Sequence, residues 1–175
     1  QTGKNLVAIG DSALFNQYAG GGYNTAIGSK SLFANSNGAF NTATGYNSLF
    51  ANTTGQSNTA NGYNALHDNT TGESNTAMGL TALASNTTGG NNTANGMSSL
   101  FSNTTGRNNT SVGTFSLLSN TVGYNNTANG YNTLMSNTTG YSNVAVGTDA
   151  LRGNQTGKNI VAIGDSALYS QSGNV

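Results

Sequence analysis

Apolar and polar positions along the chain follow a period of 17 residues, with one first step of 18. The segment Asn-Thr-Ala-x-Gly recurs, and a Leu preceded by a small residue stands four positions after each of its Gly residues. Side chains two positions apart share one face of a strand, so the Ala faces one way and its two neighbours face the other. The pattern predicts one short strand and one apolar anchor per repeat. The Gly residues are Gly10, Gly28, Gly45, Gly62, Gly79, Gly96, Gly113, Gly130, Gly147 and Gly164, and the Leu ladder is Leu14, Leu32, Leu49, Leu66, Leu83, Leu100, Leu117, Leu134, Leu151 and Leu168.

The length of the repeat selects the fold. Seventeen residues are too few for two packed helices, and a Gly in mid-repeat together with β-branched Thr and Val disfavours one continuous helix. A second Gly closes an Asn-Thr-Thr-Gly segment in most repeats and predicts a turn. We therefore expect an all-β, parallel β-solenoid of about ten coils that forms a single repeat domain over residues 1–175. Coils stacked at about 4.8 Å would give a rod roughly 48 Å long.

The composition leaves little apolar material for a core. Asn, Thr, Ser and Gly number 30, 25, 19 and 25 of the 175 residues, whereas Leu, Ile, Val and Phe total only 30. One Leu and one small residue per coil bury little area against a backbone entropy cost of roughly 1–2 kcal/mol per residue. Stacked Asn side chains and bonds between coils add cohesion. The shortfall nevertheless leads us to expect oligomerisation.

The residue after the Ala of each strand forms a mixed column. It is Ile, Val or Met in some coils, and Asn stands there at intervals of 34 residues. An exposed face would not need the large apolar residues, so we interpret the column as a semi-polar stripe where chains meet. The candidate interface residues are Ile27, Asn61, Met78, Asn95, Val112, Asn129 and Val146.

Two segments resemble a known family. Residues 5–14 are Asn-Leu-Val-Ala-Ile-Gly-Asp-Ser-Ala-Leu, and residues 159–168 differ from them only by Ile in place of Leu. They resemble the Asn-Ser-Val-Ala-Ile-Gly repeats in the head domains of bacterial trimeric autotransporter adhesins, and similar Gly-rich repeats occur in phage tail-fibre proteins. The resemblance implies a left-handed β-roll, a homotrimer, and display at a cell or virion surface for attachment. Residues 1–17 and 155–171 agree at 14 of 17 positions, which indicates a segment of a longer rod or copies that join end to end.

Charge and hydropathy exclude several partners. Five basic and five acidic residues give a net charge of zero, and the five basic ones are widely scattered, so no patch for nucleic acid is expected. No apolar stretch approaches the roughly 18 residues of a membrane span, and we expect no membrane insertion. The absence of Cys is compatible with an extracellular location.

Two features of the sequence could indicate a catalytic or metal-binding site. Gly-Asp-Ser-x-Leu, with Ser12 and again with Ser166, is similar to the nucleophile block of GDSL-type lipases and esterases. A serine hydrolase needs a base that takes the hydroxyl proton and an acid that orients the base. The only His in the sequence is His67, and Asn64 stands three residues before it, where the GDSL family has Asp. Acidic residues are isolated, and the pair nearest to a cation site, Asp68 and Glu73, flanks one turn. We expect no enzyme, no cofactor and no metal site.

Three further patterns leave alternatives open. The column Thr25, Thr42, Thr59, Thr76, Thr93, Thr110 and Thr127 is what an ice-binding solenoid would present. Exposed Tyr between polar residues is a common surface for stacking on sugars, so a glycan-binding tail-fibre module is a second alternative, with Tyr46, Tyr63, Tyr131, Tyr124 and Tyr141 as possible contacts. Packing of coil on coil is the other interpretation of the aromatic residues, especially of the Phe column.

Acceptor triplets for N-glycosylation are frequent, but the repeat itself accounts for them. Most fall where it places Asn-Thr-Thr or Asn-Asn-Thr, and turn chemistry is the better explanation because Asn side chains bond the nearby backbone. The ten triplets begin at Asn52, Asn69, Asn86, Asn91, Asn103, Asn108, Asn109, Asn125, Asn137 and Asn154.

Overall fold

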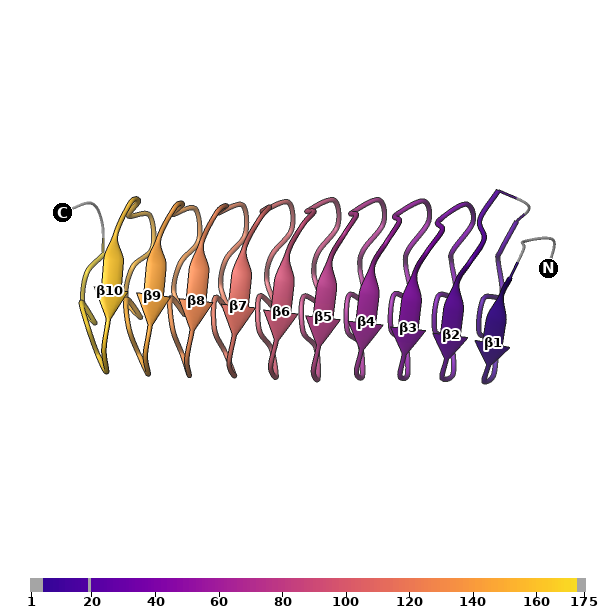
Figure 1. The fold of residues 1–175 in the computed structure, drawn as a ribbon, viewed down its shortest axis with the longest axis horizontal. Coiled ribbons are helices and arrows are strands. Elements are labelled where there is room, and N and C mark those ends of the chain that lie inside the picture. Colours follow the sequence, from indigo (N-terminus) through magenta and orange to yellow (C-terminus); the bar gives the residue numbers. More distant parts are fainter. Residues whose placement is uncertain (1–4, 19, 173–175) are drawn as a thin grey trace.

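The computed structural model describes residues 5–18 and 20–172 and shows an all-β protein. Ten strands of three residues lie in chain order in one parallel sheet, and the chain winds from each strand to the next (Figure 1). The fold is a β-solenoid of about nine turns, one fewer than the number of strands, and the described residues contain no helix. The strands are β1 (Val7–Ile9), β2 (Thr25–Ile27), β3 (Thr42–Thr44), β4 (Thr59–Asn61), β5 (Thr76–Met78), β6 (Thr93–Asn95), β7 (Thr110–Val112), β8 (Thr127–Asn129), β9 (Val144–Val146) and β10 (Val161–Ile163).

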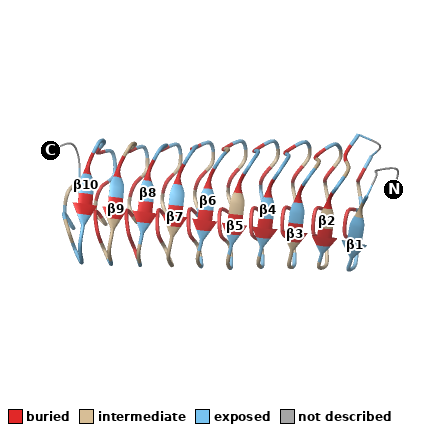
Figure 2. Cartoon of the chain, in the orientation of Figure 1, coloured by how far each residue is buried: buried red, intermediate tan, exposed pale blue. Residues whose placement is uncertain are grey.

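Each strand places its middle residue inside the coil. That residue is Ala in nine strands and Ser111 in β7, and from β2 to β9 it is completely buried. The pairing keeps every repeat position in register, so Ala26 lies beside Ala43 and Thr25 beside Thr42. Figure 2 shows buried residues recurring at the same places from coil to coil. The alternation predicted for the strand is confirmed, because the small column is the one that faces inward.

The Leu ladder forms the apolar centre of the rod. From Leu14 to Leu151 its members are 0% exposed, whereas Leu168 in the last coil is 43% exposed. All ten Leu residues adopt the left-handed conformation, with φ between 50° and 54°. Residues other than Gly, Asn and Asp seldom adopt this conformation, because the Cβ atom crowds the backbone. Left-handed residues turn the chain sharply, which is how a coil of 17 residues closes around a single Leu.

Hydrogen bonds between coils continue beyond the short strands. In the third coil, the backbone N–H of Leu49 donates to the carbonyl of Ala65 at 3.0 Å, and the backbone N–H of Ala51 donates to the carbonyl of His67 at 2.9 Å. In the turn, the amide of Thr53 donates to Thr70 at 2.9 Å. The same bonds recur along the rod, so the whole circumference of each coil pairs with the next coil and not only its three strand residues.

Asn side chains fill the part of the core that Leu and Ala leave empty. One set, which we call the first Asn ladder, stands directly before each strand from β2 to β9. Each Oδ1 accepts the backbone N–H of the residue 17 positions later at 2.9–3.1 Å. Each Nδ2 donates to the carbonyl of a Gly 14 positions later at 2.8–2.9 Å. The members are Asn24, Asn41, Asn58, Asn75, Asn92, Asn109, Asn126 and Asn143, each no more than 1% exposed.

The second Asn ladder lies three residues after the Leu ladder. Each Nδ2 from Asn52 onward donates to the Oδ1 of the Asn one coil earlier at 2.6–3.1 Å. A buried amide is costly only when its polar atoms lack partners, and here the stack satisfies them. The apolar shortfall of the sequence is therefore partly met by hydrogen-bonded amides within one chain. The members are Asn35, Asn52, Asn69, Asn86, Asn103, Asn120, Asn137 and Asn154, all 0% exposed.

The Asn ladders also account for most of the glycosylation triplets. Seven of the ten acceptor residues belong to the ladders and are fully buried, so a glycan on them is incompatible with the folded coil. Asn52, for example, donates to the carbonyl of Gly55 at 3.1 Å, which is the turn chemistry expected from the sequence. The exposed acceptors are Asn91, Asn108 and Asn125.

Candidate functional site

The outward side of the sheet is the most regular surface of the rod. The first and third residues of each strand point away from the buried middle residue, and together they form what we call the outer sheet face. None of the twenty residues at these positions of β1–β10 is charged. The face therefore consists of Thr and Asn together with exposed apolar side chains such as Ile27 and Met78.

The predicted interface residues all lie on this outer sheet face. Ile27 is 39% exposed and Met78 is 43% exposed, while Val112 and Val146 are half-buried. The three Asn residues of the column are exposed, and within the described part of the chain their side chains form no hydrogen bond. The structure thus brings the seven predicted residues into one column, where apolar side chains and free amides lie open to a partner. They are Ile27, Asn61, Met78, Asn95, Val112, Asn129 and Val146.

The Thr column runs beside them on the same face. Its seven members occupy the first position of β2–β8, and each strand pair holds them in register. Five of them are exposed and Thr25 and Thr76 are half-buried. Successive Thr residues are separated by one strand spacing of about 4.8 Å. From β2 to β8 the outer sheet face therefore presents one Thr and one variable residue per coil, and in β1, β9 and β10 Val7, Val144 and Val161 take the place of the Thr.

The five Tyr residues considered for ligand contact lie in two separate columns. Tyr46 and Tyr63 stack on each other with ring centroids 5.5 Å apart, and Tyr131 meets the edge of Phe115 at 6.2 Å. Tyr124 and Tyr141 stack at 4.7 Å in another column. The structure does not bring the two groups together.

Aromatic residues after the Leu ladder stack between coils. The ring of Phe33 lies 5.3 Å from that of Phe15 and 5.2 Å from that of Phe50, which in turn lies 5.2 Å from the ring of His67. These nearly parallel rings confirm packing of coil on coil for the Phe column, at the distances at which offset stacking is favourable.

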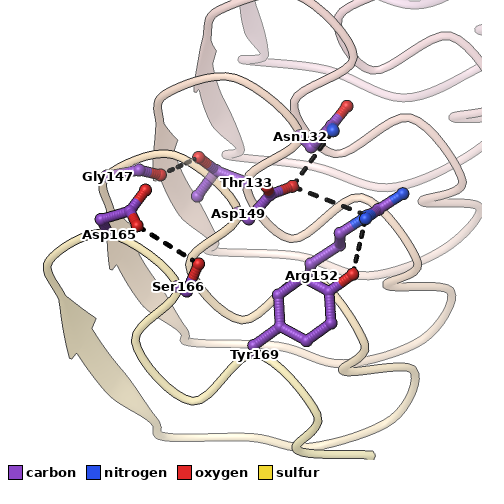
Figure 3. Close-up of polar contacts among 8 residues, drawn as sticks. All are labelled: Asn132, Thr133, Gly147, Asp149, Arg152, Asp165, Ser166 and Tyr169. Carbon is purple, nitrogen blue, oxygen red and sulfur yellow. Dashed lines mark hydrogen bonds and ion pairs between the residues drawn. The ribbon is translucent and has the colours of Figure 1, made fainter.

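The Gly-Asp-Ser segments lack a base in reach. Ser166 donates a long hydrogen bond of 3.4 Å to the neighbouring carboxylate of Asp165 (Figure 3). His67 follows β4, whereas Ser166 follows β10, so the two are six coils or roughly 29 Å apart. Ser12, which follows β1, is three coils or roughly 14 Å away from His67. The hydroxyl and imidazole are not arranged for proton transfer.

Two pairs of charged side chains lie in contact in the described part of the chain. His67 contacts Asp68, with Nδ1 2.6 Å from Oδ1. Asp149 accepts a hydrogen bond from Asn132 of the preceding coil at 3.1 Å and pairs with Arg152 of its own coil at 3.6 Å (Figure 3). Over residues 5–18 and 20–172, no three His, Cys, Asp or Glu side chains gather where they could hold a metal ion.

Sequence reasoning missed a polar hollow in the loop ahead of the strands. It has a volume of about 230 Å³ and is lined by hydroxyl and amide groups together with Glu73, Gly90 and Arg107. The available signal was Gly90 itself. It stands at a position that carries a long side chain in the coils on both sides of it, but 25 Gly residues in one chain made any single Gly inconspicuous.

Comparisons of the chain with protein-family models, with curated proteins and with solved structures found no match. Within the described ranges there is also no helix of the length and hydropathy that a membrane crossing requires.

Proposed function

We propose that the chain is a non-enzymatic rod of an extracellular fibre, in which copies associate side by side through the outer sheet face. The observation that carries the proposal is the column of exposed Ile, Met and Val side chains, interrupted by unbonded Asn, on a face without charge. Contiguous exposed apolar surface on a soluble chain marks an interaction site. The resemblance of the terminal coils to adhesin heads supports three left-handed rolls around a common axis, displayed at a cell or virion surface.

A second copy is the occupant that fits this face best. A rod with the same coil spacing presents its own apolar and amide groups at the same intervals, so each coil meets an equivalent coil along the whole contact. Neutrality of the face removes electrostatic repulsion between copies. Many small contacts repeated at one spacing then add up, which gives a stiff fibre and multivalent attachment without a single strong site.

The test is the oligomeric state of the chain and of two matched variants. Val112→Lys places a charge in the column of the outer sheet face, whereas Val122→Lys places the same charge at an exposed Val of the loop. We expect the wild-type chain of 17.7 kDa and V122K to elute as trimers in size-exclusion chromatography with light scattering, and V112K to be monomeric. A monomeric wild type at concentrations of about 100 μM, a range in which even weak specific interfaces assemble, would refute the proposal.

The regular Thr column favours ice binding as a second candidate function. Seven exposed or half-exposed Thr residues in register on a flat, uncharged face form a repeating array of methyl and hydroxyl groups. Ice binding needs this face free, whereas self-association covers it. Thermal hysteresis of a monomeric chain that is lost in Thr93→Lys and kept in Thr105→Lys, a substitution in the loop, would support ice binding and contradict the trimer. Absence of hysteresis would eliminate it.

A further inference from the structure

One loop column interrupts the regularity of the rod. The residue after the second Gly of each coil is exposed or half-buried, and over six successive coils it is Gln56, Glu73, Gly90, Arg107, Tyr124 and Tyr141. The loop lies ahead of each strand, at the upper edge of the rod in Figure 1. At Gly90 the column has no side chain, so a slot opens between the side chains of the coil before and the coil after. Glu73 and Arg107 flank it with their backbones about 9–10 Å apart, twice the coil spacing.

The backbone does not require Gly at this position. A Cβ on Gly90 would meet only the backbone of Glu73, at 3.1 Å from its carbonyl oxygen, and no side-chain atom lies within 4 Å of it. Gly89, beside it, differs because a Cβ there would collide with the side chain of Asn86 and the carbonyl of Gly106. Gly89 is therefore needed for packing, whereas the position of Gly90 carries a side chain in the neighbouring coils, as at Glu73 and Arg107, and the absence of one here leaves space.

The slot is built from hydrogen-bonding groups. Its volume of about 230 Å³ lies below the range of about 300–1,000 Å³ typical of drug-sized ligands, which limits the occupant to a single small ring or a group of that size. Besides the two charged residues, Ser74, Thr88 and Asn91 contribute hydroxyl and amide groups to the lining. Among the described residues, neither Glu73 nor Arg107 has an ion-pair partner, so a carboxylate and a guanidinium face the slot with their bonding capacity unused.

A second hollow adjoins the first across Arg107. It measures about 270 Å³ and is lined by Val122 and Tyr124 together with the amides of Asn108 and Asn125. Tyr141 covers one face of the Tyr124 ring at 4.7 Å, so the opposite face is turned toward the coil of Arg107. An apolar ring face beside amide groups suits the mixed polar and apolar surface of a sugar. The two hollows share Arg107, and together, as what we call the groove, they extend from the coil of Glu73 to that of Tyr124, three coil spacings or roughly 14 Å along the rod.

We propose that this groove binds two successive rings of an acidic polysaccharide, with a carboxylated sugar in the slot at Gly90. Arg107 lies between the two hollows and presents the planar pair of donors that recognises a carboxylate. Glu73, on the far wall, accepts hydrogen bonds from sugar hydroxyls and repels a second acidic group, which fixes the orientation of the ring. The adjoining ring packs against Tyr124. The site lies outside the outer sheet face, so the proposal does not depend on how copies assemble.

Calorimetric titration with trigalacturonic acid tests the proposal, with maltotriose as the neutral trisaccharide. Arg107→Gln should weaken binding of the acidic trisaccharide by about tenfold or more, since it removes a charge-assisted bond. Gly90→Gln should abolish binding because it fills the slot with the side chain that the column already carries at Gln56. Lys158→Gln, which removes the same charge at the same loop position three coils beyond Arg107, is the control and should stay within about twofold of wild type.

Three results would overturn the site. The first is the absence of a binding heat up to about 10 mM trigalacturonic acid. The others are equal affinity for maltotriose and equal weakening of binding by R107Q and K158Q. Circular dichroism of each variant establishes that the rod is folded. A chain that binds the acidic trisaccharide as a monomer would support the groove while contradicting the fibre proposal, so the two proposals fail separately.

Discussion

Replacing one Asn of the first Asn ladder should destabilise the rod far more than replacing an Asn of the same coil on the outer sheet face. Asn92 is 1% exposed, and its Oδ1 accepts the backbone N–H of Asn109 at 3.0 Å and the side-chain amide of Asn109 at 3.2 Å. Its own Nδ2 donates to Gly106 at 2.9 Å and to Asn75 at 3.2 Å. Asn92→Ala removes all four bonds at once.

The cost follows from which groups keep another partner. The carbonyl of Gly106 still accepts from Asn103 at 3.1 Å, and the amide of Asn109 still donates to Gly123 at 2.8 Å. The backbone N–H of Asn109 loses its only acceptor and remains buried, which costs about 1–3 kcal/mol. The bond from Asn92 Nδ2 to Gly106, the shortest of the other three lost bonds, adds about 1 kcal/mol. The free energy of unfolding should therefore fall by about 2–4 kcal/mol.

Urea unfolding followed by circular dichroism measures the difference. With a slope of about 2 kcal/mol per molar urea, a loss of 2–4 kcal/mol lowers the midpoint by about 1–2 M. Asn95→Ala, three residues away in the same coil, removes an exposed amide without a hydrogen bond and should shift the free energy by no more than about 0.5 kcal/mol. Both variants are compared at one protein concentration, because self-association would add to stability. Equal midpoints for N92A and N95A would refute the role assigned to the Asn ladders.

Two further substitutions test the packing of single coils. Leu100→Ala should cost about 2–5 kcal/mol in urea unfolding because a completely buried side chain is removed, and a cost no greater than that of the half-buried Leu118→Ala would contradict the Leu ladder as the centre of the core. Gly113→Ala should prevent coils from stacking, since φ is 126° and the added Cβ would lie 2.7 Å from a backbone carbon of the next coil. Gly90→Ala, whose added Cβ would lie 3.1 Å from one backbone carbonyl oxygen at a position where other coils carry side chains, should unfold much closer to wild type, and similar melting of the two would contradict the geometry.

The period of the sequence was enough to predict the strands and the inward direction of Ala and Leu. Ala26 and Leu32 are buried as the two columns require, because repetition multiplies a weak local pattern into an unambiguous one. The partner of the outer sheet face could not be predicted in this way, because residues such as Met78 and Asn95 have the same pattern whether or not a second chain covers them.

The conformation of Leu and the depth of the Asn residues could not be derived from residue types. Leu49 has no side-chain group that favours φ of 51°, and its conformation is imposed by the closure of a short coil. Asn52 in a turn motif would ordinarily be expected at the surface, yet it is fully buried because the neighbouring coils supply partners for every polar atom. Both features depend on stacking, which a single repeat does not contain.

The amides of the second Asn ladder are aligned along the axis of the rod. In this ladder the Nδ2 group points toward the preceding coil and the Oδ1 atom toward the following coil, as in the bond from Asn86 to Asn69. Amide dipoles arranged head to tail add along an axis, as peptide dipoles do in a helix. The second Asn ladder therefore contributes a dipole moment along the long axis of a chain with zero net charge, and this contribution is positive toward β1.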